Sequence, residues 1–225
     1  MEKEIVIIKK NKFWIRLSGV GILLLFVYSF LSLGVKPKID TTAIKEIAFI
    51  DYPVEFNYRQ TKNDCGPFSV AAVVRALAGK NISAASFAQE IGWRLPNKYT
   101  LPWGLESQLK AHDISVEKPN FRFLADNEKV MLIQQYLSLG KLIIILGERD
   151  NYEHYITILG FDSNKDQYYI YDSLQSSSPE QKDMTIDENA ALPGNKTMKS
   201  QELIDFWRGG GIYGFWRWYG LVASL

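Results

Sequence analysis

The chain has 225 residues, of which 47% are hydrophobic and 23% are charged, so a collagen-like, coiled-coil or wholly disordered protein is excluded. Its 26 basic and 25 acidic residues leave a net charge of +1, which gives no electrostatic reason to expect a nucleic-acid partner. Cys65 is the only cysteine. An internal disulfide and a thiolate zinc cluster are therefore excluded, whereas a reactive thiol is still allowed.

The first 35 residues have the pattern of an export and anchoring segment. Residues 17–35 form a run of nineteen residues without a charged side chain, which is long enough to cross a bilayer as one transmembrane helix. Residues 1–16 carry five basic and two acidic side chains, and this excess favours a cytoplasmic basic segment. We therefore expect a single-pass membrane protein whose remaining chain is exported to the periplasmic or extracellular side.

A cleaved signal peptide is the alternative interpretation of this segment. The string Ser32-Leu33-Gly34 places small residues at the two positions that a signal peptidase prefers. The apolar run is longer than the usual signal core of ~7–15 residues, which favours an anchor that stays attached. Both interpretations export the domain, and cleavage would produce a secreted form.

The chain after the anchor is expected to consist of a linker at 36–50 and one domain at 51–225. Asn63 or Asp64 offers the N-cap of a helix that ends before Gly79. Three further helices are expected, and they begin at Ser83, after Thr100 and at about Asn127.

Strands become the better interpretation later in the chain. The runs are rich in β-branched and aromatic residues and are bounded by turn residues; they lie at 142–146, 154–161, 167–171 and 216–222. A polar, turn-rich stretch between 172 and 200 is expected to be a long surface loop. Because helices come first and strands later, the order predicts an α+β domain with its helical half packed on an antiparallel sheet.

Cys65 stands at the start of the first of these helices, in the string Asp64-Cys65-Gly66-Pro67. Unpaired backbone N–H groups and the positive end of the helix dipole stabilise a thiolate at such a position. A lone cysteine can also be a small buried hydrophobic residue. The amide side chain of Gln60 before the thiol, and a glycine after it that lets a substrate backbone approach, favour a nucleophile.

Nucleophilic catalysis also needs a base and a group that orients this base. The chain has two histidines, His112 and His154. His112 is expected in the exposed last turn of a helix, whereas His154 opens a strand. The next strand ends in Asp172, so a hairpin about the turn 162–166 would bring a carboxylate to the imidazole. The pattern therefore predicts a Cys-His-Asp set that includes Cys65.

This arrangement resembles the papain-like bacteriocin-processing cysteine peptidases, which remove double-glycine leader peptides, and their stand-alone relatives. The likeness rests on a Gln, then Asp-Cys-Gly-Pro at a helix start, then a His at the head of a strand and an Asp at the end of the next strand. It covers about residues 52–222. It implies a papain-like cysteine peptidase fold and a peptide or protein substrate, and we expect no cofactor and no metal.

The resemblance also implies a role for each residue of the set. The nucleophile would be Cys65, the general base and acid His154, and the orienting carboxylate Asp172. Gln60 would donate to the oxyanion beside the backbone N–H of Cys65. Two features depart from the usual family pattern: Ser173 replaces a proline after the Asp, and Gln60 stands five positions before Cys65.

Three further residues are candidates for substrate contact. In papain-like folds, the segment before the third helix lines one side of the substrate groove, where Trp103 and Gly104 stand in this chain. Gly66, next to the nucleophile, would let the substrate backbone come close. The alternative for Trp103 is a ring packed on the core.

The leading functional hypothesis is a membrane-anchored cysteine peptidase that works through an acyl-enzyme intermediate. An acyltransferase or a peptidoglycan amide hydrolase would use the same triad, because Cys-His-Asp sets serve acyl transfer in general. A non-catalytic peptide-binding module on this scaffold is the third hypothesis, motivated by the altered Asp172-Ser173 step. The sequence leaves the substrate and the oligomeric state open.

Overall fold

The computed structural model describes residues 19–21, 35–60, 63–174, 193–211 and 215–225. The chain divides into two compact units, residues 1–36 and residues 37–225. The transmembrane helix expected at 17–35 falls almost wholly outside the described residues, as does most of the polar loop expected between 172 and 200. Within the described ranges, no helix combines the length and the apolar character that a membrane span requires. Both expectations stay predictions.

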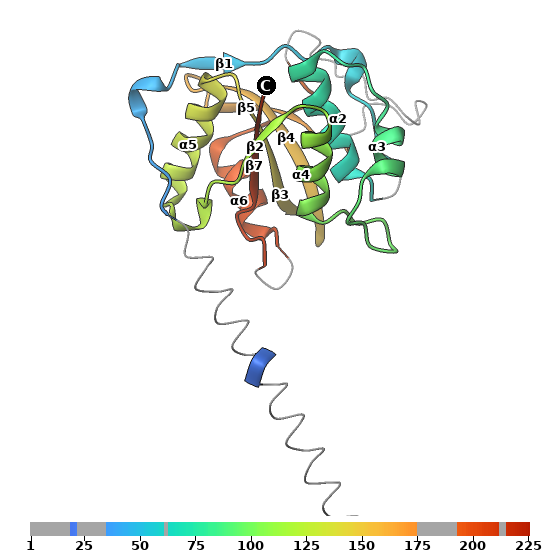
Figure 1. Ribbon diagram of the computed structural model, residues 1–225. Helices are drawn as coiled ribbons and strands as arrows, with labels where there is room; N and C mark the ends of the chain where they lie inside the picture. Colours follow the sequence, from blue (N-terminus) through green and yellow to red (C-terminus); the bar gives the residue numbers. More distant parts are fainter. Residues whose placement is uncertain (1–18, 22–34, 61–62, 175–192, 212–214) are drawn as a thin grey trace, which may run out of the picture. The chain divides into compact units, whose positions relative to one another are not determined.

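One antiparallel sheet forms the centre of the second unit (Figure 1). Its longest strands are β3 and β4, whose side chains are almost all buried, in keeping with their β-branched and aromatic composition. The strand order is β2-β7-β3-β4-β5-β6, and β1 pairs with the end of β4. The strands are β1 Ile47–Phe49, β2 Ser115–Glu117, β3 Leu142–Arg149, β4 Tyr152–Asp162, β5 Gln167–Tyr171, β6 Lys196–Met198 and β7 Gly220–Ser224.

Helices cover both faces of this sheet (Figure 1). Helices α2, α3 and α4 bury their apolar residues against one face, whereas α5 and α6 bury theirs against the other. The α-helices are α2 Cys65–Ala78, α3 Ala84–Glu90, α4 Pro102–Ala111, α5 Asp126–Ser138 and α6 Ser200–Gly209. Short 3-10 helices are η1 Thr41–Ala43, η2 Val54–Phe56 and η3 Phe121–Phe123.

The α+β class with an antiparallel sheet is confirmed, but the helices are less segregated than expected. Helix α6, which was not predicted, lies between β6 and β7 and buries Leu203, Ile204 and Trp207. Strand β7 begins four residues later than predicted. Trp216 and Trp218 have positive φ angles of 58° and 62°, and such a backbone turns instead of extending into a strand.

The residues expected to form a linker are part of the folded unit. Strand β1 pairs with β4, and the Asp40 N–H donates to the side chain of Gln135 on α5 at 2.8 Å. The approach of β1 depends on Gly160, because a Cβ there would lie 2.2 Å from the Cβ of Phe49. The folded unit therefore starts at residue 37 and not at 51.

Candidate active site

Cys65 is the first residue of α2, so its backbone N–H lies in the first turn, where a helix provides no acceptor. Its side chain is buried. Asp64 occupies the N-cap position, as expected, but its carboxylate does not cap the helix and accepts from Arg94 Nη2 at 2.6 Å. The acidic side chain beside the thiol is thereby neutralised by an ion pair.

Arg94 holds the loop before α4 over the start of α2. Besides the bond to Asp64, its guanidinium donates to the carbonyl oxygens of Ala88 and Lys98, each at 2.7 Å. Sequence reasoning missed this residue, because an arginine that stands 30 positions from its partner leaves no local pattern. Arg94 therefore helps to position the start of α2, and with it Cys65, through contacts between segments that are distant in the sequence.

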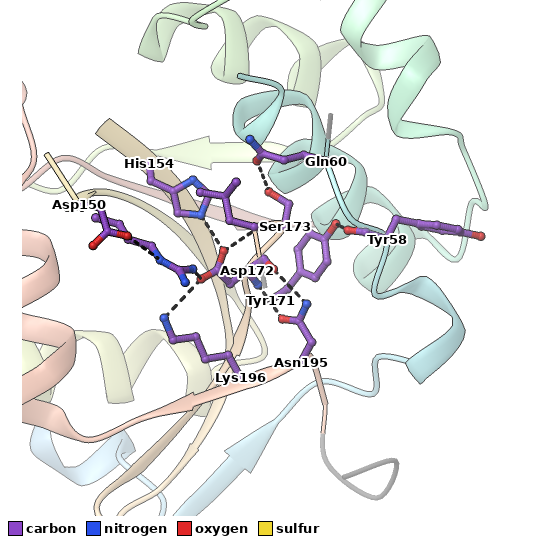
Figure 2. Close-up of polar contacts among 11 residues, drawn as sticks. Tyr58, Gln60, Asp150, His154, Tyr171, Asp172, Ser173, Asn195 and Lys196 are labelled. Atoms are coloured by element: carbon purple, nitrogen blue, oxygen red, sulfur yellow. Dashed lines mark hydrogen bonds and ion pairs between the residues drawn. The ribbon is translucent and has the colours of Figure 1, made fainter. Parts of the chain in front are cut away.

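His154 lies near the start of β4 and is almost completely buried. Its Nε2 atom is 2.7 Å from Oδ1 of Asp172, which follows directly after β5 (Figure 2). The side chain of Cys65 lies close enough to the imidazole to raise its pKa. Since Asp172 occupies Nε2, Nδ1 is the ring nitrogen left for the thiol. The structure thus brings together the three residues of the predicted set.

A β-bulge decides on which face of the sheet Asp172 lies. The register between β4 and β5 shifts by one residue at Leu159. Beyond the bulge, Ile158 pairs with Ile170, and paired residues of an antiparallel sheet share a face. Asp172 therefore shares the face of His154, and without the extra residue it would point to the opposite face. The sequence predicted the hairpin but not this bulge.

Side chains from two other segments fix Asp172 (Figure 2). Asn195 accepts from the backbone N–H of Asp172 at 2.8 Å and donates to its backbone oxygen at 3.0 Å. The carboxylate oxygen Oδ2 accepts from Arg149 Nη1 at 3.0 Å and from Lys196 Nζ at 3.3 Å. Oδ1 also accepts from the Leu174 N–H at 2.9 Å. The carboxylate is therefore held from both sides without a following proline.

Of these supporting residues, only Arg149 has a sequence signal that could have revealed it. In the β3–β4 hairpin, Gly147 pairs with His154, so Arg149 stands two residues further along the neighbouring strand. Asn195 and Lys196 come from a stretch that the sequence predicted as loop. Their side chains reach Asp172 because β6 pairs with β5, and nothing local in the sequence indicates that pairing.

The electrostatics of the pair favour its charged form. Burial by itself would lower the pKa of His154, but the hydrogen bond to Asp172 and the interactions with the side chains of Asp172 and Cys65 raise this pKa to about 9. Burial would likewise raise the pKa of Asp172, but the bond and charge of His154, together with the charge of Lys196, hold this pKa well below its usual range. The site is therefore built for an imidazolium beside a carboxylate at neutral pH.

Gln60, the predicted oxyanion-hole donor, is tied to the residue after Asp172. The hydroxyl of Ser173 donates to Gln60 Oε1 at 2.6 Å, and the Gln60 N–H donates to the backbone oxygen of Ser173 at 2.8 Å. Both residues are buried. The serine that replaces the usual proline thus makes a side-chain bond that proline could not make.

The two glycines predicted to contact substrate lie in close packing. A Cβ on Gly66 would lie 2.9 Å from the Cβ of Thr100, and a Cβ on Gly104 would lie 2.5 Å from the backbone oxygen of Gly92. The structure therefore accounts for both glycines by the packing of the loop before α4. Their contact with a substrate stays a prediction.

Trp103, the third of these residues, is 43% exposed and is not a core residue. Its ring lies between those of Trp93 and Trp216, with centroid distances of 5.6 Å and 5.5 Å. Both neighbours have positive φ angles, 56° and 58°, a conformation that is rare for bulky residues and that is found at functional sites. We call Trp93, Trp103 and Trp216 the tryptophan ledge.

Two cavities lie near the site. One of about 390 Å³ is bordered by Trp93, Trp103, Glu106, Ser107 and Lys110. A larger one of about 750 Å³ lies between α2 and α3, and its wall includes Asp64 and Arg94. Neither wall includes Cys65 or His154.

Comparison with known families agrees with this geometry. The model of the family described as the Peptidase_C39 like family matches residues 49–198. This match spans more than half of the chain and contains Cys65, His154 and Asp172. The chain belongs to the C39-like peptidase family. Membership indicates a peptidase.

Among solved structures, the C39-like chain is similar to the peptidase domain of Streptococcus ComA, a bifunctional ABC transporter involved in a quorum-sensing pathway. The two share 16% sequence identity with a TM-score of 0.44, over 78% of this chain and 100% of that chain. A search of curated proteins finds no match.

Proposed function

We propose that this chain hydrolyses peptide bonds as a cysteine peptidase, with Cys65 as its nucleophile. The observation that carries the proposal is the buried, hydrogen-bonded pair of His154 and Asp172, placed against the one cysteine of the chain at a helix start. Membership of the C39-like family supports the same activity.

The proposed reaction begins when the Cys65 thiol gives its proton to His154 and the resulting thiolate attacks the carbonyl carbon of the scissile peptide bond. The resulting tetrahedral oxyanion accepts hydrogen bonds from Gln60 Nε2 and from the Cys65 N–H. The imidazolium of His154 gives its proton to the leaving amine, the C–N bond breaks, and a thioester remains. Neutral His154 then takes a proton from water, whose oxygen attacks the thioester and releases the acid and the thiolate.

The protonation state of His154 supports this sequence of steps. Its pKa of about 9 keeps the imidazole protonated at neutral pH in the presence of the Cys65 and Asp172 charges. An imidazolium can protonate the leaving amine directly, which is the step that limits expulsion of a poor leaving group. Asp172 acts through His154, because it fixes the tautomer and the orientation of the ring.

The deciding experiment compares cleavage of a proteome-derived peptide mixture by the full-length chain and by its Cys65→Ala variant, with new termini detected by mass spectrometry. We expect new termini with the wild type and none with Cys65→Ala. His154→Gln should remove cleavage as well. His112→Gln is the matched control and should leave cleavage unchanged, because His112 lies at the end of α4. Undiminished cleavage by Cys65→Ala would refute the proposal.

We further propose that the tryptophan ledge contacts the substrate side chains. The exposure of Trp103 and the unusual backbone of its two neighbours support this role. Replacing Trp103 by Ala should raise KM by about tenfold, the loss of one aromatic contact, with little change in kcat. An unchanged KM for cleaved peptides would restrict the ledge to a structural role.

We also propose that residues 17–35 anchor the peptidase in a membrane with the domain exported. The run of nineteen uncharged residues after a basic segment supports this topology. The chain should remain in the membrane pellet after alkaline carbonate extraction, and protease added from outside should digest its domain. Recovery of a chain that starts near residue 35 would instead establish the cleaved, secreted form.

A further inference from the structure

Gln60 can stabilise an oxyanion only if its amide presents the nitrogen, and not the oxygen, to the substrate. A glutamine amide has an acceptor oxygen on one arm and two N–H donors on the other, and the two arms are nearly equal in shape. Packing alone therefore does not distinguish the productive orientation from the reversed one. A hydrogen bond to a single arm has to select the orientation.

Ser173 makes this selecting hydrogen bond as a donor, because the short distance between its oxygen and the amide arm is usual for O–H···O and shorter than usual for the N–H···O bond of a reversed amide. Its hydroxyl donates to Gln60 Oε1 at 2.6 Å, and Figure 2 shows the amide oxygen directed at Ser173 with the nitrogen turned away from it. Ser173 is 1% exposed and Gln60 is 9% exposed, so water competes little for this bond. The backbone bond from the Gln60 N–H to the Ser173 oxygen keeps the two residues side by side.

We propose that Ser173 is a positioning residue that orients the Gln60 amide so that Nε2 faces the oxyanion; this inference rests on the proposed function. Ser173 directly follows Asp172, which orients His154 through a bond of 2.7 Å. The dipeptide Asp172-Ser173 thus orients both the base, His154, and the oxyanion donor, Gln60. Because the Asn195 side chain bonds to the Asp172 backbone on both sides, the dipeptide is itself held firmly.

Two reactions of Cys65 separate this role from an effect on the thiol. Acylation by p-nitrophenyl acetate passes through a tetrahedral oxyanion and releases p-nitrophenolate, whereas alkylation by iodoacetamide displaces iodide directly and forms no oxyanion. With the rate of Cys65→Ala subtracted as background, the Ser173→Ala variant should acylate about 3- to 10-fold more slowly, the effect of one neutral hydrogen bond. Its alkylation rate and the pH profile of alkylation should match those of the wild type.

A double-mutant cycle and a conservative variant complete the test. Gln60→Ala should slow acylation by about 10²- to 10³-fold, because it removes the donor itself. Adding Ser173→Ala to Gln60→Ala should cause no further loss, since no amide remains to be oriented. Ser173→Thr keeps the hydroxyl and should acylate faster than Ser173→Ala.

Several results would overturn the inference. These are a wild-type acylation rate in Ser173→Ala, an equal fall of acylation and alkylation in that variant, or additive losses in the double variant. They leave the proposed function intact, because the wild type still acylates. If the wild type itself does not acylate faster than Cys65→Ala, the proposed function fails and this inference fails with it.

Discussion

The two halves of the candidate site are held by different forces. On the sheet side, His154 and Asp172 lie among hydrogen bonds and positive charges. On the helix side, Cys65 starts a helix whose neighbouring loop packs without spare room on Gly66 and Gly104. The position of the base therefore depends on charge and on pH, whereas the position of the nucleophile depends on side-chain volume together with the one ion pair between Asp64 and Arg94.

The largest effect is expected from removing the carboxylate that holds His154. Asp172→Ala removes the acceptor of His154 and also the carboxylate that Arg149 and Lys196 contact. We expect kcat/KM for a cleaved peptide to fall by up to about 10⁴-fold. Asp172→Asn should lose less, because its amide oxygen still accepts from the imidazole. Equal activity of Asp172→Ala and wild type would remove Asp172 from the mechanism.

The pH dependence of stability tests the same half. A histidine whose pKa rises on folding, here from 6.5 to about 9, stabilises the folded state fully below pH 6.5. This stabilisation is lost as the pH rises to about 9, a loss of up to about 3 kcal/mol. Urea unfolding between pH 6 and 9.5 should show the decline in the wild type and in His112→Gln, but not in His154→Gln. Parallel curves for the wild type and His154→Gln would contradict it.

The packed half should respond to a change of volume at its glycines. A Cβ on Gly104 would meet the backbone oxygen of Gly92 at 2.5 Å, so Gly104→Ala should lower the free energy of unfolding by about 1–3 kcal/mol at any pH. Gly92→Ala is the matched control, because its Cβ would meet nothing within 4 Å. A denaturation midpoint for Gly104→Ala equal to that of Gly92→Ala would show that the loop moves to accommodate the added methyl group.

The smallest effect is expected from removing one of the positive charges that contact Asp172. Lys196→Met removes one positive charge from Oδ2 of Asp172, so more of the carboxylate charge acts on the imidazolium. The pKa of His154 should rise further and move the alkaline limb of the pH–activity profile upward, with kcat/KM changed by about threefold or less. Lys199→Met, whose amine donates to the backbone oxygen of Lys165, should leave the profile in place.

The sequence predicted those parts of the site that depend on local pattern. A cysteine at a helix start, a histidine in one strand and an aspartate after the next can be located from turn residues and periodicity. Their meeting also follows from the hairpin, because its turn places Asp172 near His154. The bulge at Leu159 was missed, although Gly160 directly after it was a signal, because a glycine inside a strand can mark either a bulge or a close backbone approach.

The supporting residues could not be predicted from the sequence for a different reason. Arg94 and Asn195 act on partners 30 and 23 positions away, so only the tertiary fold brings them to the site. Helix α6 was missed because its apolar residues span only a short stretch of sequence, directly before a run of glycines, and so give a weak helical periodicity. The linker at 36–50 was misjudged because three residues of an edge strand carry too little pattern to predict pairing with β4.

Because Leu159 is unpaired, the number of residues in the two arms of the hairpin decides whether His154 and Asp172 lie on the same face of the sheet. Adding or removing one residue in either arm of this hairpin would turn the carboxylate of Asp172 away from His154, whereas a change of two would return it. The turn at 163–166 is exempt, because it lies outside the strand pairing. Relatives with the same chemistry should therefore vary freely in that turn, but only by even steps in the arms unless the bulge is also lost.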